Sequence, residues 1–542
     1  MRVMNAITDK PEWDRKILNE EIVSKWREEI STSGEDISPA MIDYIFEELQ
    51  AKAEFLKDEG FVTVFDMGVV KSDTAIPEDL RKALADAVAP LENVSDDQKD
   101  YHPGSDQKVL DLVHPSLFPL VYGHSRILRD ETIGLEDCLG TTGQGEILPI
   151  PSMIEQGRAS RFVARRYFDE VLYSHKFQWL PCDVGLNVTE AEHECRITSY
   201  INNLHPVRHR DLYAIVEKFI ARAIPLWNRS LTGERYNSRR IIFDQVEYEE
   251  PSDPPPEQWP DEDDEAFYQR FDAYEENQVI KKPEPGQFQR DKLAVQNEIN
   301  IHEQFGKTGL QVIVKLANIE LSPESPKYNG GSWHIEGQLN ERICATAIYY
   351  YDSENITESP LAFRQRANAD YIAEGVRYPQ SRHEFLQQIY GFEHEVTGND
   401  NNCQITQDLG EVSCRQGRLL TFPNVLQHRV TPFSLADPSK PGHRKILALF
   451  LVDPHLRIIS TANVPPQQED WGKEKHDLTH EVLSGRLPAE LKDMVCEEGV
   501  LQPLMSMEEA KGLRLELMKE RSVKSVEQNE VFERGSFSLC EH

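Results

Sequence analysis

The residues with the clearest chemical potential are two histidines and a glutamate. His334 and Glu336 stand two positions apart in YNGGSWHIEGQLN (328–340), and His428 lies in a later segment, GRLLTFPNVLQHRVTP (417–432). Side chains two apart on an extended chain point to the same side, so an imidazole and a carboxylate converge and His428 can supply a third ligand. Two histidines and one carboxylate on one face of an octahedron are the ligand set of non-haem iron(II) oxygenases, and this arrangement leaves three positions open.

Arg444 is the candidate cation for a co-substrate at such a centre. A bidentate 2-oxo acid, 2-oxoglutarate, would fill two open positions and dioxygen the third, and its distal carboxylate then needs a positive partner. Arg444 begins the apolar segment RKILALFLV (444–452). In a regular strand it shares a face with Ile446, Ala448 and Phe450, which places the charge at the mouth of a barrel and apolar groups deeper. A planar guanidinium binds a carboxylate through two hydrogen bonds.

Other polar residues lie near this set. Tyr328, Asn340 and Asn424 flank the three candidate ligands. They either hydrogen-bond the 2-oxo acid or form turns, and the sequence leaves both interpretations open. His102, His114 and His205 are interpreted as structural or surface residues, because the sequence places no carboxylate partner beside them.

The elements that must position these residues are strands that begin at about residue 308. Runs rich in apolar and β-branched residues occupy 310–321, 342–351, 418–422, 444–452 and 456–460, with Gly, Pro and Asn between them. Several strands of this kind predict a sandwich or a small barrel.

The chain before the strands is predicted to be mostly helical. Ser38 and Pro39 begin a helix that Gly60 ends, a second helix begins near Pro77, and a third spans about 211–227. Residues 61–65 predict a strand. The stretch 247–287 is acidic and rich in proline, which indicates a linker or exposed loop, with docking to a basic partner as the alternative. Near the C-terminus, Ser506 and Glu509 form a capping box before another helix.

The composition narrows the class of protein. The formal net charge is -34 over 542 residues, which repels phosphate backbones and anionic membranes, so we expect no nucleic-acid or membrane partner. No run of 18 or more apolar residues predicts a transmembrane helix, and the N-terminus lacks the apolar stretch of a secretory signal. The eight cysteines form no CxxC pair, so we expect reduced buried thiols and a cytoplasmic location.

Longer strings resemble a family of fungal proteins labelled only as a domain of unknown function, whose members look like 2-oxoglutarate and iron(II)-dependent oxygenases. The strings are HPGSD (102–106), VLDLVHPSL (109–117), FQWLP (177–181), ITSYINNLHP (197–206), WHIE (333–336) and STANVPP (460–466). The resemblance covers most of the chain. The broader oxygenase superfamily implies a double-stranded β-helix, also called a jelly roll, together with the metal and the co-substrate.

The chain departs from that superfamily at two places. Glu336 stands where the superfamily more often has Asp, so strand position must absorb an extra methylene. His428 and Arg444 are 16 positions apart, longer than the usual interval, and SLADPSKPG (434–442) looks like the inserted loop. The longer interval leaves Arg429, Lys445 and Arg457 as rival anchors for 2-oxoglutarate.

These observations predict an α+β enzyme with four parts: a mainly helical region (1–245), an acidic linker (246–290), a double-stranded β-helix core (291–470) and a C-terminal helical extension with a flexible tail (471–542). We expect an Fe(II)- and 2-oxoglutarate-dependent dioxygenase that oxidises a C–H bond of a small-molecule or amino-acid-like substrate. Two alternatives remain: an iron-dependent oxygenase that does not use 2-oxoglutarate, and a non-catalytic cupin-like binding protein.

Overall fold

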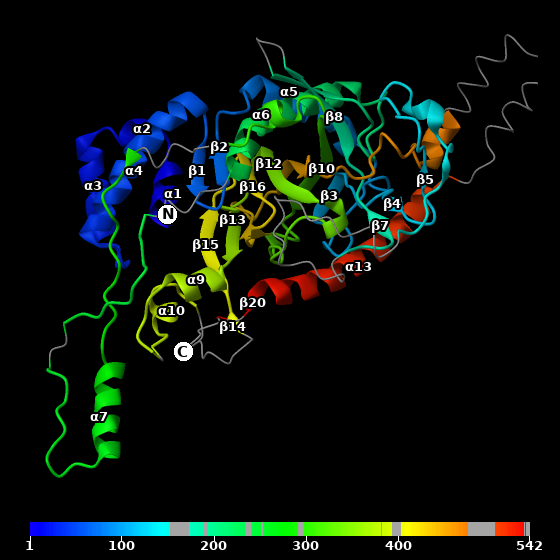
Figure 1. Ribbon diagram of the computed structural model, residues 1–542. Helices are drawn as coiled ribbons and strands as arrows, with labels where there is room; N and C mark the ends of the chain where they lie inside the picture. Colours follow the sequence, from blue (N-terminus) through cyan, green and yellow to red (C-terminus); the bar gives the residue numbers. More distant parts are fainter. Residues whose placement is uncertain are drawn as a thin grey trace, which may run out of the picture.

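The computed structural model describes residues 1–151, 173–188, 193–232, 240–250, 253–290, 298–380, 382–392, 403–474, 504–535 and 537. Helices and strands are mixed, and a large antiparallel sheet runs through the middle of the molecule (Figure 1). Within these residues, no helix is long and apolar enough to cross a membrane.

The large sheet has nine strands in the order β1-β2-β16-β12-β19-β10-β8-β9, and β3 pairs with β10 off this path. Its middle consists of β10 (Leu310–Leu321), β12 (Ile343–Glu354), β16 (Leu419–Pro423) and β19 (Gly442–Val452). Strands from earlier in the chain extend it: β1 (Val62–Phe65), β2 (Val69–Ser72), β3 (Val109–Val113), β8 (Cys182–Val188) and β9 (His193–Ile197).

The two faces of this sheet pack against different layers. Helices α5 (Glu78–Glu92) and α6 (Arg210–Thr232) cover one face, where Leu447 and Leu449 of β19 lie in the core (Figure 1). The opposite face packs against a three-stranded sheet of β13 (Leu361–Arg366), β15 (Thr406–Val412) and β17 (Gln427–Val430), ordered β15-β13-β17. Ala448 and Phe450 lie in this inner core with Phe363. Because side chains alternate along a strand, β19 contributes side chains to both cores.

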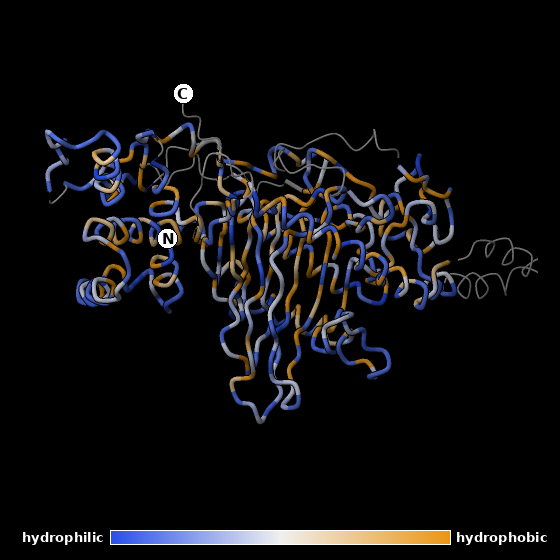
Figure 2. Tube along the Cα trace, turned by 90° about the horizontal axis from the view of Figure 1, so that it is seen from below, coloured by the Kyte–Doolittle hydropathy of each residue, from blue (hydrophilic) through white to orange (hydrophobic). Residues whose placement is uncertain are grey.

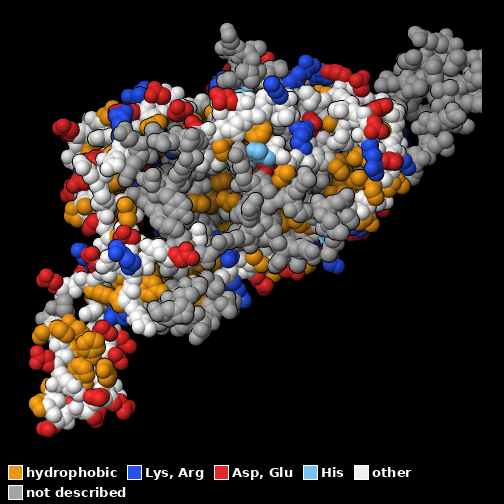
Figure 3. Space-filling model, in the orientation of Figure 1, with side chains coloured by type: hydrophobic (Ala, Val, Ile, Leu, Met, Phe, Trp, Pro, Cys, Tyr) orange, Lys and Arg blue, Asp and Glu red, His pale blue; other side chains and the backbone are white. Residues whose placement is uncertain are grey.

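Figure 2 shows the long central strands side by side, with the remaining elements gathered around them. Helices α1 (Arg2–Thr8), α2 (Trp13–Lys16), α3 (Glu20–Ser31) and α4 (Pro39–Glu59) form an apolar cluster at one end. Helix α7 (Asp264–Glu276) stands on a projecting arm, buries none of its residues, and carries hydrophobic side chains beside acidic ones (Figure 3). Helix α13 (Met507–Glu533) runs along the underside of the body (Figure 1).

Shorter elements complete the fold. They are β4 (Leu120–Val121), β5 (Arg126–Ile127), β6 (Glu146–Ile147), β7 (Phe177–Gln178), α8 (Ile301–Phe305), β11 (Lys327–Tyr328), α9 (Ala369–Gly375), α10 (Phe385–Gln388), β14 (Cys403–Gln404), β18 (Phe433–Ser434), β20 (Arg534–Gly535) and 3-10 helices at Cys138–Thr141 and Leu339–Glu341.

Most of the predicted core elements are confirmed. Strands β10, β12, β16 and β19 match the runs predicted at 310–321, 342–351, 418–422 and 444–452. Helix α4 has Ser38 at its N-cap and Gly60 in the left-handed region at its end, as the sequence indicates.

Three predictions need correction. The region before residue 245 does more than pack on the barrel, because its strands β1, β2, β3, β8 and β9 join the large sheet. Residues 456–460 form no strand; the side chain of Gln311 bonds both the N–H and the carbonyl of Ile458, at 2.9 Å each, in place of a neighbouring backbone. The tail is ordered through α13 and β20, and Phe537 is buried. Residues 475–503, also predicted helical, lie outside the described residues.

A buried ion-pair network fixes α4 to the segment at residue 240. Glu48 is 1% exposed and binds Lys52 at 2.9 Å and Arg240 at 2.6 Å. Burial alone would raise the pKa of Glu48, but Lys52 and Arg240 outweigh it and lower the pKa from 4.5 to about 2. Because the folded-state pKa is depressed, the ionised carboxylate contributes stability above about pH 4.5 that is lost as the pH falls toward 2.

We therefore expect Glu48→Gln to lower the free energy of unfolding at pH 7 by about 3 kcal/mol. Urea denaturation between pH 7 and pH 3 should show a flatter pH dependence for this variant than for the unmodified protein. Glu47→Gln, which changes an exposed neighbour on the same helix, is the control. Equal stability losses in the two variants would contradict the assignment.

Candidate metal centre

His334 and His428 face each other across an antiparallel bridge. The N–H of His334 donates to the carbonyl of His428 at 3.2 Å, and the N–H of His428 donates to the carbonyl of His334 at 3.0 Å. This mutual pair sets the imidazoles side by side, with ring centroids 4.4 Å apart. The bridge joins the segment after β11 to strand β17, so residues almost a hundred positions apart meet at one point.

Glu336 completes the group on the same side as His334. Its Oε1 lies 3.3 Å from Nε2 of His428 and 3.8 Å from Nε2 of His334. Ligand atoms of all three residues lie within 4.8 Å of one another. Two donors on neighbouring sites of an octahedral ion, each ~2.1 Å from it, are ~3 Å apart, so a small closure of these side chains would bring them to ligand distances. The structure thus brings together the three residues that the sequence singled out.

The protonation states of His334 and Glu336 suit the binding of a metal cation. Nδ1 of His334 lies 2.8 Å from the carbonyl of Ser332, which can only accept, so Nδ1 carries the proton and Nε2 keeps its lone pair. Burial, followed by the neighbouring His428, lowers the pKa of His334. Burial alone would raise the pKa of Glu336, but the hydrogen bond to His428 and the electrostatic effect of the neighbouring imidazoles outweigh it and lower the pKa to about 2. An ionised carboxylate beside a neutral imidazole is the form that binds a metal.

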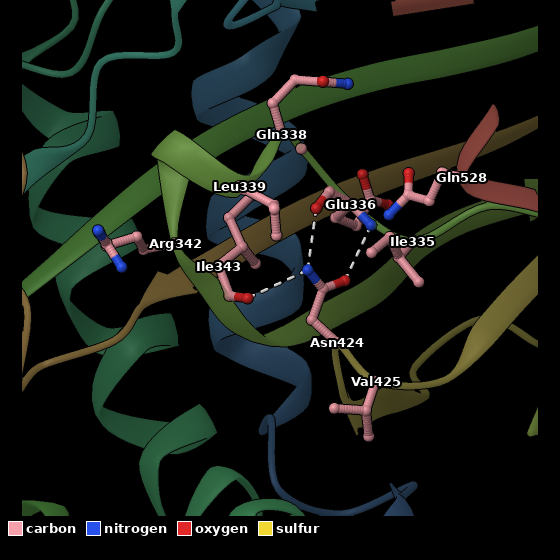
Figure 4. Close-up of a pocket in the computed structure, with 10 residues that line it drawn as sticks. Ile335, Glu336, Gln338, Leu339, Arg342, Ile343, Asn424, Val425 and Gln528 are labelled. Atoms are coloured by element: carbon pink, nitrogen blue, oxygen red, sulfur yellow. Dashed lines mark hydrogen bonds between the residues drawn. The ribbon is translucent and has the colours of Figure 1, made fainter. Parts of the chain in front are cut away.

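Asn424 holds the backbone of Glu336 in place (Figure 4). Its side-chain oxygen accepts from the N–H of Glu336 at 2.8 Å, and its amide nitrogen donates to the carbonyls of Glu336 at 2.9 Å and Ile343 at 3.1 Å. The amide is therefore engaged by backbone groups. Of the two interpretations of Asn424, the structure supports the one in which the side chain stabilises the loop. It does not support binding of the 2-oxo acid by this side chain.

Asn340 is also engaged by the backbone. Its amide nitrogen donates to the carbonyl of Phe177 at 2.9 Å, and its oxygen accepts from the N–H of Ser174 at 3.3 Å. It fastens the loop after Glu336 to the segment around β7. The predicted co-substrate role is corrected for this residue too.

Helix α13 reinforces the centre from more than a hundred positions away. The amide nitrogen of Asn529 donates to the carbonyl of Trp333 at 3.1 Å, and its oxygen accepts from Nε2 of Gln427 at 2.7 Å. Trp333 directly precedes His334, and Gln427 directly precedes His428. One side chain of α13 thus links the two histidine-bearing segments, and no local sequence signal identifies it. Gln528 of the same helix lies beside Glu336 in Figure 4.

Arg444 lies on the inner face of β19, as predicted. It is 2% exposed, and its face is shared with Ile446, Ala448 and Phe450 of the inner core. Its guanidinium packs over the rings of Tyr350 at 5.5 Å and Phe433 at 5.1 Å. Nη1 donates to the carbonyl of Ser359 at 3.2 Å, whereas Nε has no hydrogen-bond partner within the described chain. A buried positive charge without a carboxylate is costly, so this geometry favours an anionic ligand.

Tyr328 lies beside Arg444. Its ring packs on Phe433 with centroids 5.3 Å apart, the same ring that Arg444 covers. Burial raises the pKa of Tyr328, and the charge of Arg444 partly opposes this rise. Tyr328 and Arg444 thus pack against the same ring.

The rival cations have other partners. Lys445 forms ion pairs with Glu92 at 2.9 Å and Asp352 at 3.5 Å, and Arg457 pairs with Asp183 at 2.5 Å. Arg429 is exposed and packs over Trp333 at 4.5 Å. None of the three is a buried cation like Arg444.

A second group of possible ligands consists of His102, Asp111 and His114, whose ligand atoms also lie within 4.8 Å of one another. Nδ1 of His102 lies 2.8 Å from Asp111, and Nδ1 of His114 accepts from the N–H of Ser116 at 3.2 Å. Arg514 approaches the same Asp111 oxygen at 3.7 Å, which disfavours a metal there. The expectation that no carboxylate accompanies these histidines is wrong, because β3 brings Asp111 between them. His205 likewise has Glu474 at 3.2 Å.

The Asn424 clamp generates a prediction for local dynamics. Asn424→Ala leaves the N–H and carbonyl of the Glu336 peptide without these partners, which should cost about 1–3 kcal/mol of stability. Amide hydrogen exchange should accelerate at 334–337. Asn355→Ala is the matched control, because its side-chain amide likewise bonds only backbone groups, donating to the carbonyls of Asp437, Lys440 and Pro441 on a different loop. Unchanged exchange at 334–337 in Asn424→Ala would refute the clamp.

Comparisons with solved structures give only distant similarity. A BsmA homologue from Methylobium petroleophilum PM1 is 14% identical, with 33% of this chain and 58% of that chain aligned and a TM-score of 0.16. IDO from Bacillus thuringiensis is 10% identical, with 32% and 69% aligned and a TM-score of 0.17. The Fe(II)/(alpha)ketoglutarate-dependent dioxygenase TqaL is 12% identical, with 36% and 57% aligned and a TM-score of 0.17. The chain thus spans less than two thirds of the first and third of these proteins.

Sequence families give a firmer result. No curated protein matches the chain. Residues 1–29 match the N-terminal domain of unknown function DUF4246, and residues 39–475 match the family described as protein of unknown function (DUF4246). Since the second match covers well over half of the chain and contains His334, Glu336, His428 and Arg444, the chain belongs to the DUF4246 family.

Proposed function

We propose that the protein is an Fe(II)- and 2-oxoglutarate-dependent oxygenase built on a double-stranded β-helix. The strand order supports this fold, since β16-β12-β19-β10 form the middle of one antiparallel sheet and β15-β13-β17 form the facing one. Strands β11 and β18 pair at the end of the smaller sheet, where β18 follows β17 in the chain. Two facing sheets of this kind are the architecture of jelly rolls and cupins.

The proposed iron ligands are His334, Glu336 and His428. One carboxylate and two imidazoles form a mixed nitrogen and oxygen set that suits Fe(II), whereas thiolate ligands would favour zinc or an iron–sulfur cluster. No cysteine joins this group within the described residues. Within the described residues, the buried Nδ1 of His428 has no hydrogen-bond partner, so its ring is held by packing against Phe422 at 4.7 Å and by the backbone bridge.

The observation that carries the proposal is the buried, unpaired guanidinium of Arg444 on the same inner face as the ligand group. A protein of this charge has many carboxylates available, yet none of the described ones pairs with Arg444. The distal carboxylate of 2-oxoglutarate would supply the missing partner, with Tyr328 and the hydroxyl of Ser359, which has no partner in the described part of the chain, as further hydrogen-bonding groups.

When bound, Fe(II) and 2-oxoglutarate together supply an oxidant that attacks C–H bonds, with dioxygen as the second co-substrate and succinate and carbon dioxide as by-products. The chain itself binds and orients these groups. Arg444 fixes one end of the co-substrate, and the rings of Tyr350 and Phe433 exclude water around that end. Asn424 and Asn529 hold the ligand-bearing segments in register.

The metal assignment predicts selective loss of iron binding. We expect one Fe(II) per chain in anaerobic equilibrium dialysis, and an affinity more than about 100-fold lower in His334→Ala and His428→Ala, because even changes in outer partners cost about 10–100-fold. Circular dichroism should show both variants folded. His102→Ala is the control from the second histidine group. If His102→Ala lost iron while His334→Ala kept it, the assignment of the iron site to His334, Glu336 and His428 would be wrong.

The co-substrate assignment predicts a separate effect at Arg444. In Mn(II)-loaded protein under argon, calorimetry should show 2-oxoglutarate binding about 30–200-fold more weakly to Arg444→Lys, equivalent to ~2–3 kcal/mol, because an ammonium cannot reproduce the planar two-point contact. Metal affinity should be unchanged. Arg429→Met and Lys445→Met should bind 2-oxoglutarate normally. If only Arg429→Met weakened the binding of 2-oxoglutarate, the anchor would be Arg429. If the unmodified protein did not bind 2-oxoglutarate at all, an iron oxygenase that does not use it, or a cupin-like binding protein, would replace the proposal.

A further inference from the structure

Lys315 is a second positive charge on the inner face of the large sheet. It lies in the middle of β10, opposite Ala448 of β19. Its neighbours Val314 and Leu316 point into the outer core under α6, whereas Ala448 belongs to the inner core. Because side chains alternate along a strand, Lys315 points toward the inner face that holds the proposed metal centre. The side chain is only partly buried, so its ammonium can meet a ligand.

Lys315 has no direct partner in the described chain, where it forms neither a hydrogen bond nor an ion pair. Two other cations of the core, in contrast, have carboxylate partners. Arg514 binds Asp100 at 2.6 Å, and Arg521 binds the buried Glu341. A partly buried ammonium without an ion-pair partner favours binding of an anion.

Strand register places Lys315 level with the second histidine group. Asp111 of β3 pairs with Ala317, and Val113 pairs with Leu316, so His114 continues toward the level of Lys315. Burial holds the pKa of His114 well below its usual value, and the charge of Lys315 lowers it further. The positive charge of Lys315 also lowers the pKa of Glu336 and of His334, two of the proposed iron ligands.

Buried aromatic side chains lie on the inner face near the strand position of Lys315. The ring of Trp179 stacks on Phe450 with centroids 6.0 Å apart, and the guanidinium of Arg521 lies over the same ring at 3.8 Å. Phe450 is two positions from Ala448 on the same face of β19. Because Trp179 and Phe450 are buried, these rings are part of the packed core, and the ammonium of Lys315 is the group that can meet a ligand.

Arg444 and Lys315 are too far apart to share one carboxylate. Lys315 is opposite Ala448, and Arg444 is four residues further along β19, or ~13 Å in a regular strand. A carboxylate bound to Arg444 therefore leaves Lys315 available for a second carboxylate.

We propose that Lys315 forms a carboxylate-binding site on the inner face of the large sheet, beside the metal centre and separate from Arg444. This inference rests on the proposed oxygenase function and narrows its substrate class to molecules with a carboxylate. The carboxylate has two sources: the molecule that is oxidised, or the metal-chelating end of 2-oxoglutarate. In the first case, Lys315 is a specificity-determining residue that orients the substrate.

The test compares Lys315→Met with Lys327→Met, which changes an exposed lysine at the start of β11. Lys315→Arg keeps the charge and should preserve binding. One arm measures 2-oxoglutarate affinity of Mn(II)-loaded protein by calorimetry under argon. The other arm titrates the Mn(II)–2-oxoglutarate complex with hexanoate, phenylacetate and N-acetylglycine, each beside its carboxamide, using thermal shift and calorimetry.

If Lys315 binds the substrate, at least one acid but not its amide binds the unmodified protein, and Lys315→Met weakens that acid at least tenfold while 2-oxoglutarate affinity stays within twofold. If Lys315 binds the co-substrate, Lys315→Met weakens 2-oxoglutarate at least tenfold instead. The inference is overturned if folded Lys315→Met behaves like Lys327→Met in both arms. Failure of the unmodified protein to bind Mn(II) or 2-oxoglutarate would overturn the proposed function itself.

Discussion

Two backbone hydrogen bonds between His334 and His428 are the constraint on which the proposed centre depends. They form only if the segment after β11 lies antiparallel to β17, which is itself held by its pairing with β13 in the smaller sheet. The surrounding contacts maintain this pair. Asn424 holds Glu336 in register with the bridge, and Asn529 of α13 bonds the residues that directly precede both histidines. The ligand group is therefore a product of the whole β-sheet core and of its C-terminal helix.

The charges inside the core are arranged unevenly. Glu336 faces two imidazoles, and Glu341 is buried against Arg521. Arg444 and Lys315, in contrast, lie on the inner face without a carboxylate from the described chain. In a protein with net charge -34, such positions are costly unless a ligand neutralises them. A divalent ion at the triad and carboxylates at the two cations would balance this interior.

Much of the core could be predicted from sequence because its signals are local. The apolar runs of β10, β12, β16 and β19 and the spacing of His334 and Glu336 depend on a few neighbouring residues each. The same spacing rule placed Arg444 on the inner face. The inner position of Lys315 follows from that rule as well, yet its lack of a partner is visible only once the strands are paired.

The missed features depend on long-range contacts. Strands β3, β8 and β9 are short and contain Asp, Asn, Gly or charged residues that have weak strand preference, and pairing with β10 and with each other makes them strands. Asp111 meets His102 and His114 only through that pairing. The amides of Asn340 and Asn424 were equally suited to a ligand or to a turn, and only the positions of the neighbouring carbonyls decide.

The most direct measurement of the central claim is visible absorption of the Fe(II)-loaded protein under anaerobic titration with 2-oxoglutarate. A 2-oxo acid that chelates Fe(II) through its keto oxygen and carboxylate produces a weak metal-to-ligand charge-transfer band. The account predicts that this band appears and saturates at one 2-oxoglutarate per bound iron. Stoichiometric iron binding with no band at saturating 2-oxoglutarate would contradict it.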